Sequence, residues 1–242
     1  MKVLVLNSGL GTRMGAISAI QPKCMSLIYD EETILSRQLK LIKEAGLKEV
    51  VITTGKFDEL IKEYCATLQL DLDISYIKNE EYEHTNYIYS IYCAREVLKD
   101  DVLLLHGDLV FSKDVLRNII ISEDSSMIIS STEKLPEKDF KAVVENGRII
   151  QIGVQFFKNS FAAQPLYKIK KKDWEVWLNE IIHFCENNKV DVYAENAFNE
   201  ISRNIILKPL DIASGLCKEV DTIEDLERIQ AELEGQNRCR KK

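Results

Sequence analysis

The feature of this sequence that most limits its possible folds is an alternation of short apolar runs with amphipathic segments over the first 105 residues. The runs at 3–6, 49–53 and 102–105, and the strand-like 74–77, are typical of buried strands. Segments 33–45, 57–68 and 86–98 carry apolar residues at helical spacing. Such an alternation predicts an α/β fold with a mostly parallel, doubly wound, Rossmann-like sheet flanked by helices.

The pattern changes in the second half. Residues 127–130, 141–145 and 148–155 are predicted as short strands, with a turn at Asn146-Gly147. Segments 174–185 and 221–233 are predicted as helices, and 190–193 as strand-like. We therefore expect one domain, 1–235, made of a first half (1–125), a small β-rich insertion (126–220) and a closing helix (221–235). Residues 236–242 form a polar, basic tail that we expect to be frayed.

Charge and composition argue against several kinds of partner and location. The formal net charge is −7, which argues against nucleic acid or an anionic membrane as partner. No apolar run reaches membrane-spanning length, so membrane insertion is not expected. The first apolar run starts at Val3, with no signal peptide before it, and the cysteines form no C-x-x-C pair. We expect reduced thiols and a cytoplasmic location.

A glycine-containing loop follows the first predicted strand. Its residues are Asn7, Ser8, Gly9, Leu10, Gly11, Thr12 and Arg13, and Pro22-Lys23 lies downstream. Glycines let a loop turn tightly and present N–H groups to phosphate oxygens, and Arg and Lys can bind the same oxygens. A bare G-x-G is more often a plain turn. The added Thr-Arg and Pro-Lys favour a phosphate site at the carboxyl end of a strand.

Two carboxylates are candidates for a magnesium site. Asp108 follows the apolar run at 102–105, after His106 and Gly107, so its side chain should project from the end of a strand. Asp221 opens the closing segment Asp-Thr-Ile-Glu-Asp-Leu, where an N-terminal helix cap is an equally good interpretation. Mg²⁺ binds one or two carboxylates together with phosphate oxygens. Asp221 could serve as cap and ligand at once.

The glycine loop with Pro22-Lys23 closely resembles the signature of the sugar-phosphate nucleotidyltransferase superfamily, although Asn7-Ser8 stand where many members carry two alanines. The resemblance implies transfer of a nucleoside monophosphate to a phosphorylated acceptor, with release of pyrophosphate. It implies that the loop and Arg13 hold the β- and γ-phosphates and that Lys23 holds the α-phosphate or the acceptor phosphate. It also implies that Asp108 and Asp221 bind Mg²⁺. We therefore expect Lys23, Arg13 and Asp108 as catalytic residues, with Gly107 beside the nucleotide.

A second stretch of sequence indicates the subfamily. Thr85-Asn86-Tyr87-Ile88-Tyr89-Ser90 resembles a segment of bacterial phosphocholine and 2-aminoethylphosphonate cytidylyltransferases, and the resemblance extends as far as Leu226. Thr85 and Asn86 could hydrogen-bond the edge of a pyrimidine base, and a role as a helix cap is equally possible. The resemblance implies CTP and a small amine-bearing phosphate or phosphonate as substrates. Acceptor candidates are Gln164, Tyr193, Glu195 and Glu219, while Trp174 and Trp177 are expected in the core.

Two other functions remain open. One is a sugar-1-phosphate nucleotidyltransferase that uses UTP or dTTP, against which the segment at 85–90 counts. The other is a non-catalytic nucleotide-binding regulatory module, which should have lost Lys23 or one of the two aspartates. The sequence leaves the oligomeric state open, and a homodimer is compatible with it.

Overall fold

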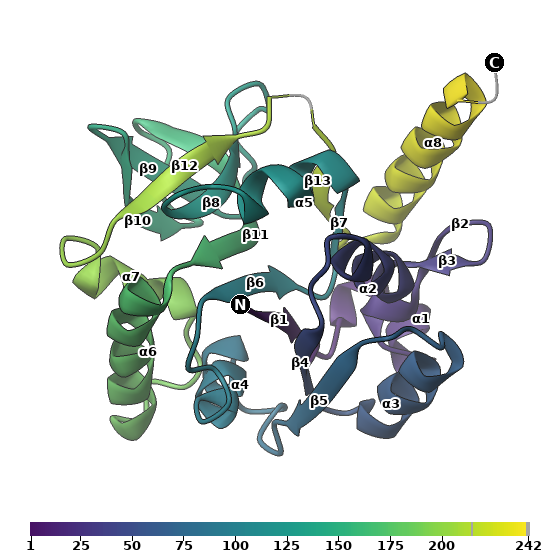
Figure 1. Ribbon diagram of the computed structural model, residues 1–242, viewed down its shortest axis with the longest axis horizontal. Helices are drawn as coiled ribbons and strands as arrows, with labels where there is room; N and C mark the ends of the chain where they lie inside the picture. Colours follow the sequence, from purple (N-terminus) through teal and green to yellow (C-terminus); the bar gives the residue numbers. More distant parts are fainter. Residues whose placement is uncertain (214, 241–242) are drawn as a thin grey trace.

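The computed structural model describes residues 1–213 and 215–240 (Figure 1). The strands are β1 Lys2–Leu6, β2 Leu27–Tyr29, β3 Glu32–Thr33, β4 Glu49–Thr54, β5 Asp73–Lys78, β6 Val102–His106, β7 Leu109–Phe111, β8 Ser125–Ser130, β9 Lys141–Glu145, β10 Arg148–Gly153, β11 Ser160–Ile169, β12 Leu207–Asp211 and β13 Cys217–Glu219. The helices are η1 Thr12–Met14, α1 Ala16–Ile20, η2 Lys23–Met25, α2 Ile34–Glu44, α3 Asp58–Thr67, α4 Tyr87–Ala94, α5 Lys113–Ile120, α6 Lys171–Glu186, α7 Ala194–Ile201 and α8 Ile223–Arg240.

The central sheet contains a parallel part in the order β5-β4-β1-β6. From β1 the chain passes to β4 and β5 on one side and then returns to β6 on the other. The sheet order therefore reverses between β1 and β6, and ligands of open α/β sheets bind beyond the carboxyl ends of the strands at such a point. The predicted mostly parallel, doubly wound sheet is confirmed.

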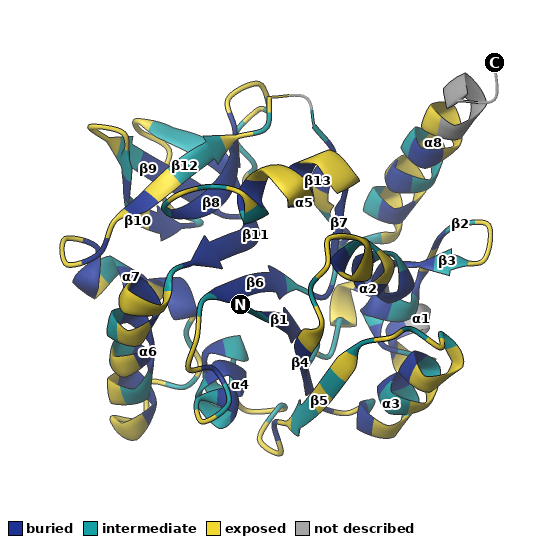
Figure 2. Cartoon of the chain, in the orientation of Figure 1, coloured by how far each residue is buried: buried dark blue, intermediate teal, exposed yellow. Residues whose placement is uncertain are grey.

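Alternate residues of β1 face opposite layers. Leu4 and Leu6 pack in a cluster with α4, α6 and α7, whereas Val3 and Val5 pack in a cluster with α2, α3 and α5. Figure 2 shows the central strands buried between helices whose outer faces are exposed. The period of two along the strand and the apolar stripes of the helices together produce this three-layer arrangement.

The β-rich part of the second half is continuous with the central sheet. β11 pairs antiparallel with β6 through residues 166–169, with β8 through 162–164 and 167–168, and with β9 through 160–162. β8 in turn pairs in parallel with β12, and β9 forms a hairpin with β10 around Asn146-Gly147. The segment predicted as an insertion thus extends the sheet rather than forming a layer of its own.

Local signals placed the ends of several helices correctly. Thr33 caps α2 by accepting a hydrogen bond from the Ser36 amide at 3.0 Å, and Gly46 follows with φ of 79°. The strand predicted at 190–193 is wrong, because Tyr193 is the N-cap of α7. The tail expected to be frayed is helical to Arg240, since α8 meets no proline that would end it. Residues 241–242 of the tail lie outside the described residues.

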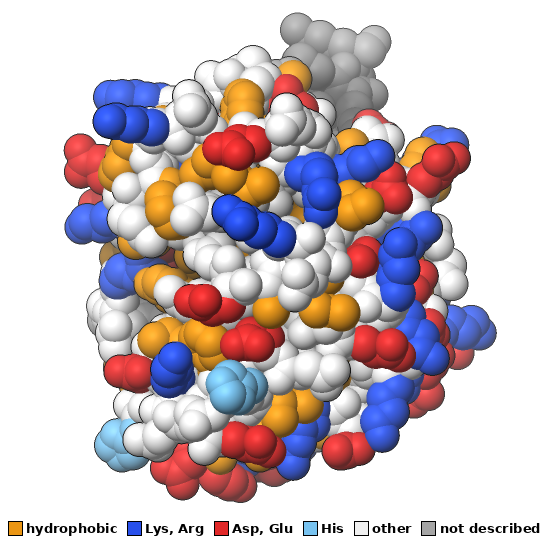
Figure 3. All heavy atoms as spheres, turned by 90° about the vertical axis from the view of Figure 1, so that its left-hand side faces the viewer, with side chains coloured by type: hydrophobic (Ala, Val, Ile, Leu, Met, Phe, Trp, Pro, Cys, Tyr) orange, Lys and Arg blue, Asp and Glu red, His pale blue; other side chains and the backbone are white. Residues whose placement is uncertain are grey.

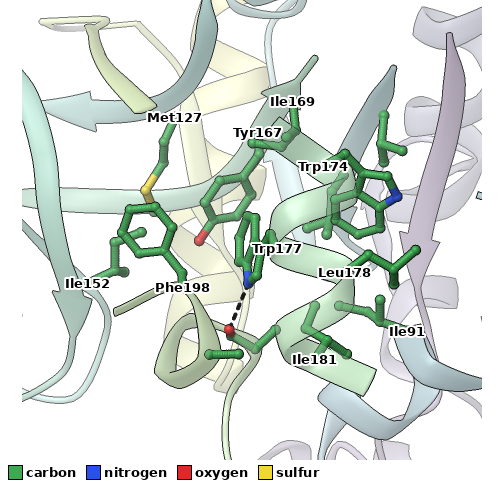
Figure 4. Packing of buried hydrophobic residues seen from close by; sticks show 14 of the residues in the cluster. Ile91, Met127, Ile152, Tyr167, Ile169, Trp174, Trp177, Leu178, Ile181 and Phe198 are labelled. Atoms are coloured by element: carbon green, nitrogen blue, oxygen red, sulfur yellow. Dashed lines mark hydrogen bonds between the residues drawn. The ribbon is translucent and has the colours of Figure 1, made fainter. Parts of the chain in front are cut away.

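The two tryptophans of α6 lie in the core, as expected (Figure 4). Both are fully buried, and the Trp177 indole donates a hydrogen bond to the Ala194 carbonyl at 3.0 Å. The Trp174 indole donates to the Leu98 carbonyl at 2.8 Å. α6 thereby fixes both the loop after α4 and the first turn of α7, which carries Glu195.

One face of the surface carries charges of both signs. Figure 3 shows a face on which basic and acidic side chains lie among one another, so the described part of this face presents both signs of charge. Among residues 1–213 and 215–240, none of the helices has the length and apolar character needed to cross a bilayer.

Candidate active site

The carboxyl ends of β1 and β6 open into a cavity of about 700 Å³. One side of it, here called the charged wall, consists of residues 7–13 with Lys23, Asp108, Glu219 and Asp221. Another part of the lining, here called the aromatic wall, consists of Tyr87, Phe140, Val154 and Tyr193. The site therefore lies where the sheet order reverses and draws its other residues from later segments.

Two glycines shape the charged wall. Gly11 has φ of 64°, a left-handed conformation that glycine adopts without strain. Gly107 admits the side chain of Asn7, because a Cβ on residue 107 would lie 1.6 Å from the Asn7 Oδ1 atom. The buried Asn7 Nδ2 atom has no hydrogen-bond partner among the described residues, so it is available to a ligand in the cavity.

Lys23 lies between the two candidate metal carboxylates. Its ammonium forms ion pairs with Asp108 and with Asp221, the latter at 2.6 Å, and Arg13 contacts Asp221 at 2.7 Å. Burial disfavours the charge of Lys23, but the two carboxylates outweigh it and raise its pKa. Burial would likewise raise the pKa of Asp108, but Lys23 holds it below its usual value. Both groups are therefore charged at neutral pH.

The carboxylate of Asp221 is not used as a helix cap. Thr222 Oγ1 accepts from the Asp225 amide at 3.2 Å, and Asp225 Oδ2 accepts from the Thr222 amide at 3.0 Å. This reciprocal pair satisfies the first turn of α8 in the manner of a capping box. Asp221 is thus left free to face Lys23 and Arg13, which excludes the cap as the role of its side chain, while its binding of a metal ion stays a prediction.

Glu219 and His106 complete the acidic end of the cavity. His106 Nδ1 lies 3.3 Å from Glu219 Oε1, and one ligand atom from each of His106, Asp108 and Glu219 falls within 4.8 Å of the others. Burial raises the pKa of Glu219 above its usual value, and neighbouring Asp108 adds to the effect. Although burial opposes it, Glu219 raises the pKa of His106.

This acidic end fits a divalent cation. Asp108 and Asp221 reach the same ammonium, and the buried Asp108 Oδ1 atom has no hydrogen-bond partner in the described part of the chain. With Glu219, the set offers carboxylate oxygens beside a phosphate-binding loop, which is the ligand type that Mg²⁺ prefers. The structure therefore adds Glu219, expected at the acceptor, to the residues that could bind the metal.

The aromatic wall is built from stacked rings. Tyr87 and Tyr193 stack with ring centroids 5.8 Å apart, and Phe140 meets Tyr193 edge-on at 5.1 Å. Tyr87 also contacts His106 edge-on at 4.8 Å. The exposed fraction of Tyr193 is 39%, so its ring is accessible. Such a wall offers ring faces to an organic cation.

Glu195 lies behind this wall rather than in the cavity. It is buried, and its carboxylate accepts hydrogen bonds from the hydroxyls of Tyr87 and Tyr167, the latter at 2.6 Å. Its carboxylate contacts the aromatic wall through the Tyr87 hydroxyl, and its charge also acts on His106, which lines the cavity. Gln164, in the middle of β11, also does not line the cavity. The structure thus brings Tyr193 and Glu219 to the site, but not Gln164 and Glu195.

Thr85 and Asn86 line the cavity, and both also serve local structure. The Asn86 side chain accepts from the Tyr87 amide at 2.8 Å as N-cap of α4. The Thr85 hydroxyl donates to the Glu81 carbonyl at 2.8 Å and accepts from the Asn79 amide group at 2.9 Å. Their role toward a pyrimidine base stays a prediction.

Sequence reasoning missed Phe140 and Val154 as cavity residues. Phe140 belongs to the segment between β8 and β9, and Val154 follows β10. Neither position carries a sequence signal, because an apolar residue next to a strand is usually a core residue. Tyr87 lay within the recognised segment at 85–90, but its side chain had no assigned role.

Comparison with known proteins places the chain in a family. Residues 3–145 match the model of the MobA-like NTP transferase domain. The chain therefore belongs to this family, and it is an enzyme that transfers nucleotidyl groups. The nucleotidyltransferase resemblance drawn from its motifs is confirmed.

Individual relatives are consistent with this. The chain is 25% identical to a CTP:phosphoglutamine cytidylyltransferase of Campylobacter jejuni, over 94% of this chain and 98% of the relative. It is 32% identical to a CMP-5'-(3-aminopropyl)phosphonate synthase of Streptomyces rubellomurinus, over 56% of this chain and 22% of that protein. The solved CTP:phosphocholine cytidylyltransferase of Streptococcus pneumoniae superposes with a TM-score of 0.77 at 17% identity, covering 96% of this chain and 98% of that one.

Proposed function

We propose that the protein is a Mg²⁺-dependent cytidylyltransferase that transfers CMP from CTP to a small amine-bearing phosphate or phosphonate and releases pyrophosphate. One observation carries the proposal. Lys23, Asp108 and Asp221 meet beside the glycine loop and share one cavity with the stacked rings of Tyr87 and Tyr193. Two relatives, a CTP:phosphoglutamine cytidylyltransferase and a CMP-5'-(3-aminopropyl)phosphonate synthase, support the same choice.

The reaction is a displacement at phosphorus. An oxygen of the acceptor phosphate forms the new bond to the α-phosphorus of CTP, and the bond from that phosphorus to the bridging oxygen of pyrophosphate breaks. The acceptor oxygen is already anionic at neutral pH, so no general base is needed. Catalysis then depends on placement and on neutralising charge. The backbone of residues 7–13 and Arg13 would hold the β- and γ-phosphates, and Lys23 would contact the α-phosphate.

Magnesium would be held by Asp108 and Asp221, with Glu219 as a further carboxylate. When bound, the ion supplies charge neutralisation on the phosphate oxygens. Repulsion among the three carboxylates is offset by Lys23 and Arg13 at Asp108 and Asp221, and Glu219 contacts His106; a bound cation would take over part of this. Lys23 is then free to turn toward the phosphates.

The amine of the acceptor would lie against the aromatic wall. Ring faces attract ammonium groups, and the buried charge of Glu195 behind Tyr87 favours a cation over a neutral sugar. Phosphocholine, 2-aminoethylphosphonate and similar amines share this chemistry. Sugar rings also pack on aromatic side chains, but a neutral sugar lacks the positive charge that a tyrosine pair backed by a carboxylate attracts.

Pyrophosphate release tests the proposal. The purified enzyme would be assayed with CTP, UTP, dTTP, ATP and GTP, each with phosphocholine, 2-aminoethylphosphonate, 3-aminopropylphosphonate, phosphoglutamine and glucose 1-phosphate, with and without Mg²⁺. We expect activity with CTP, Mg²⁺ and at least one amine-bearing acceptor. Activity only with glucose 1-phosphate and UTP or dTTP would replace this proposal by the sugar-nucleotide alternative. Turnover with none of the pairs would favour the regulatory module.

A further inference from the structure

Lys141 is a charged side chain buried without access to solvent. It is the first residue of β9, and its exposed fraction is 0%. Its ammonium donates hydrogen bonds to three backbone carbonyls: Val154 at 2.7 Å, Asp139 at 3.0 Å and Glu137 at 3.4 Å. The ring of Phe157 covers it, with the nitrogen 4.2 Å from the ring centroid. Lysine is almost never fully buried unless paired, so this position calls for a specific reason.

The three acceptors match the three N–H groups of the ammonium. Burial lowers the pKa of Lys141, and the negative charge of nearby Asp139 only partly opposes this. The side chain therefore lies in a cage of carbonyl dipoles, which is a costly way to use a charge. An apolar residue would fill the same volume without that cost, but it could not hold the three carbonyls together.

The carbonyls belong to segments that form the aromatic wall. Glu137 and Asp139 flank Lys138 in the loop before β9, and Lys138, Asp139, Phe140 and Val154 all line the cavity. Phe140 is the residue whose ring meets Tyr193 at 5.1 Å. Lys141 thus joins the loop at 137–140 to the end of β10, directly behind the rings.

We propose that Lys141 is a positioning residue that holds the 137–140 loop and Val154 in place, and thereby sets the affinity for the acceptor. The proposal rests on the proposed function for its kinetic consequence, but not for the structural one. Without the ammonium, three carbonyls would face one another with no donor, and the loop would move to reach water. Phe140 would then lose its place against Tyr193. Among the described residues no hydrogen bond joins residues 7–13 to the cage, although Asp139 lies close enough to Arg13 and Asp221 for their charges to act on it.

The chain contains a matched control. Lys168 on β11 is also buried, and its ammonium donates to the carbonyls of Ile120, at 3.0 Å, and Ser122. Burial lowers its pKa as well. Lys168 does not line the cavity, and the carbonyls that it binds lie at the last residue of α5 and just after it rather than in the aromatic wall. Lys168→Met therefore removes the same chemistry from a place that holds neither the 137–140 loop nor Val154.

The first measurement needs no substrate. Hydrogen exchange of the full-length protein would be compared for wild type, Lys141→Met and Lys168→Met. We expect amides in the 137–140 loop to exchange at least about tenfold faster in Lys141→Met, with protection of β1 and β6 unchanged. Lys168→Met should leave that loop as in wild type. Equal exchange of the loop in wild type and Lys141→Met would overturn the proposal.

The second measurement is kinetic, with the acceptor that wild type uses best. In Lys141→Met we expect the acceptor KM to rise about tenfold while the KM for CTP changes less than about twofold, because small displacements of a binding group are costly. Lys141→Gln retains a hydrogen-bond donor, so its acceptor KM should lie between the values of wild type and Lys141→Met. If Lys141→Met does not fold, Lys141→Gln carries the same comparison.

The outcomes separate the two proposals. An equal rise in KM for CTP and acceptor, or an equal effect in Lys168→Met, would overturn the role of Lys141 in acceptor binding. If wild type turns over none of the acceptors, the proposed function fails, and the exchange measurement still decides whether Lys141 holds the loop.

Discussion

The charged wall and the aromatic wall are built in different ways. Most of the charged wall comes from loops that follow β1 and β6, and its side chains pair with one another through ion pairs. The aromatic wall takes Tyr87 from α4, Phe140 and Val154 from the ends of β9 and β10, and Tyr193 from the start of α7. The charged side chains at strand ends are suited to a reaction step that many enzymes share. The aromatic rings, which come from separate segments, are suited to recognising a particular acceptor.

The largest effect should follow from changing the carboxylates of the charged wall. We expect Asp108→Asn and Asp221→Asn each to lower turnover by on the order of 10³-fold, since neutralisation by a metal contributes several kcal/mol. Pyrophosphate release measures the loss, and a melting curve controls for folding. Removing Mg²⁺ with a chelator should have a similar effect on wild type. Near-full activity in either variant would refute the assignment of these carboxylates to the metal. It would also refute the view that the charged wall carries the reaction step while the aromatic wall recognises the acceptor.

A smaller effect is expected for the cations of the same wall. Lys23→Met should lower kcat by about 10²-fold, because a donor aimed at developing charge contributes this much in other active sites. Arg13, with a side chain 60% exposed, should matter less, and we expect about tenfold for Arg13→Met. Steady-state kinetics with CTP varied would measure both. If Lys23→Met has an unchanged kcat but a raised acceptor KM, Lys23 contributes to acceptor binding rather than to the reaction step.

The aromatic wall should respond in KM rather than in kcat. Tyr193→Ala should raise the acceptor KM by about three- to thirtyfold, the range expected from a lost contact between a cation and a ring. The KM for CTP should stay within about twofold of wild type. Tyr92→Ala is the control, because Tyr92 stacks on Tyr89 at 5.5 Å and does not line the cavity. If Tyr193→Ala lowers kcat and leaves both KM values unchanged, the wall does not select the acceptor.

The smallest effect concerns an ion pair in the same half as the charged wall but outside the cavity. Asp58 accepts from Thr54 at 2.5 Å and from Lys62 at 2.7 Å, and although burial opposes it, these partners lower the pKa of Asp58. Its carboxylate therefore stabilises the fold above its unfolded pKa of about 4, and this stabilisation is lost as pH falls through the lower folded value. Asp58→Asn should cost about 1 kcal/mol or less at pH 7.

Urea unfolding of wild type and Asp58→Asn between pH 3 and pH 7 would measure this, as the difference should shrink below about pH 4. Steady-state constants at pH 7 should be unchanged. A large loss of activity would mean that charge in this half supports catalysis from outside the cavity.

Local sequence signals account for the features that one short segment can specify. The capped helix after Thr33, the turn at Asn146-Gly147 and the buried run before Asp108 each depend on neighbours in the sequence. The strand expected at 190–193 was wrong for a related reason. Its apolar residues alternate as in a strand, but they precede the N-cap of α7, and packing rather than pattern decided their conformation.

Local patterns of the chain are enough to predict the parallel sheet, the glycine loop at the end of β1 and the position of Asp108 at the end of β6, because alternating polarity and φ preferences act over a few residues. Which distant groups meet depends on the packing of the whole fold. Lys23 reaches Asp221 across 198 positions of sequence because α8 packs near β2, and Thr222 with Asp225 takes over the cap that Asp221 could have formed. Glu195 became the buried partner of Tyr87 for the same reason: contacts between remote segments follow from the packing of whole elements.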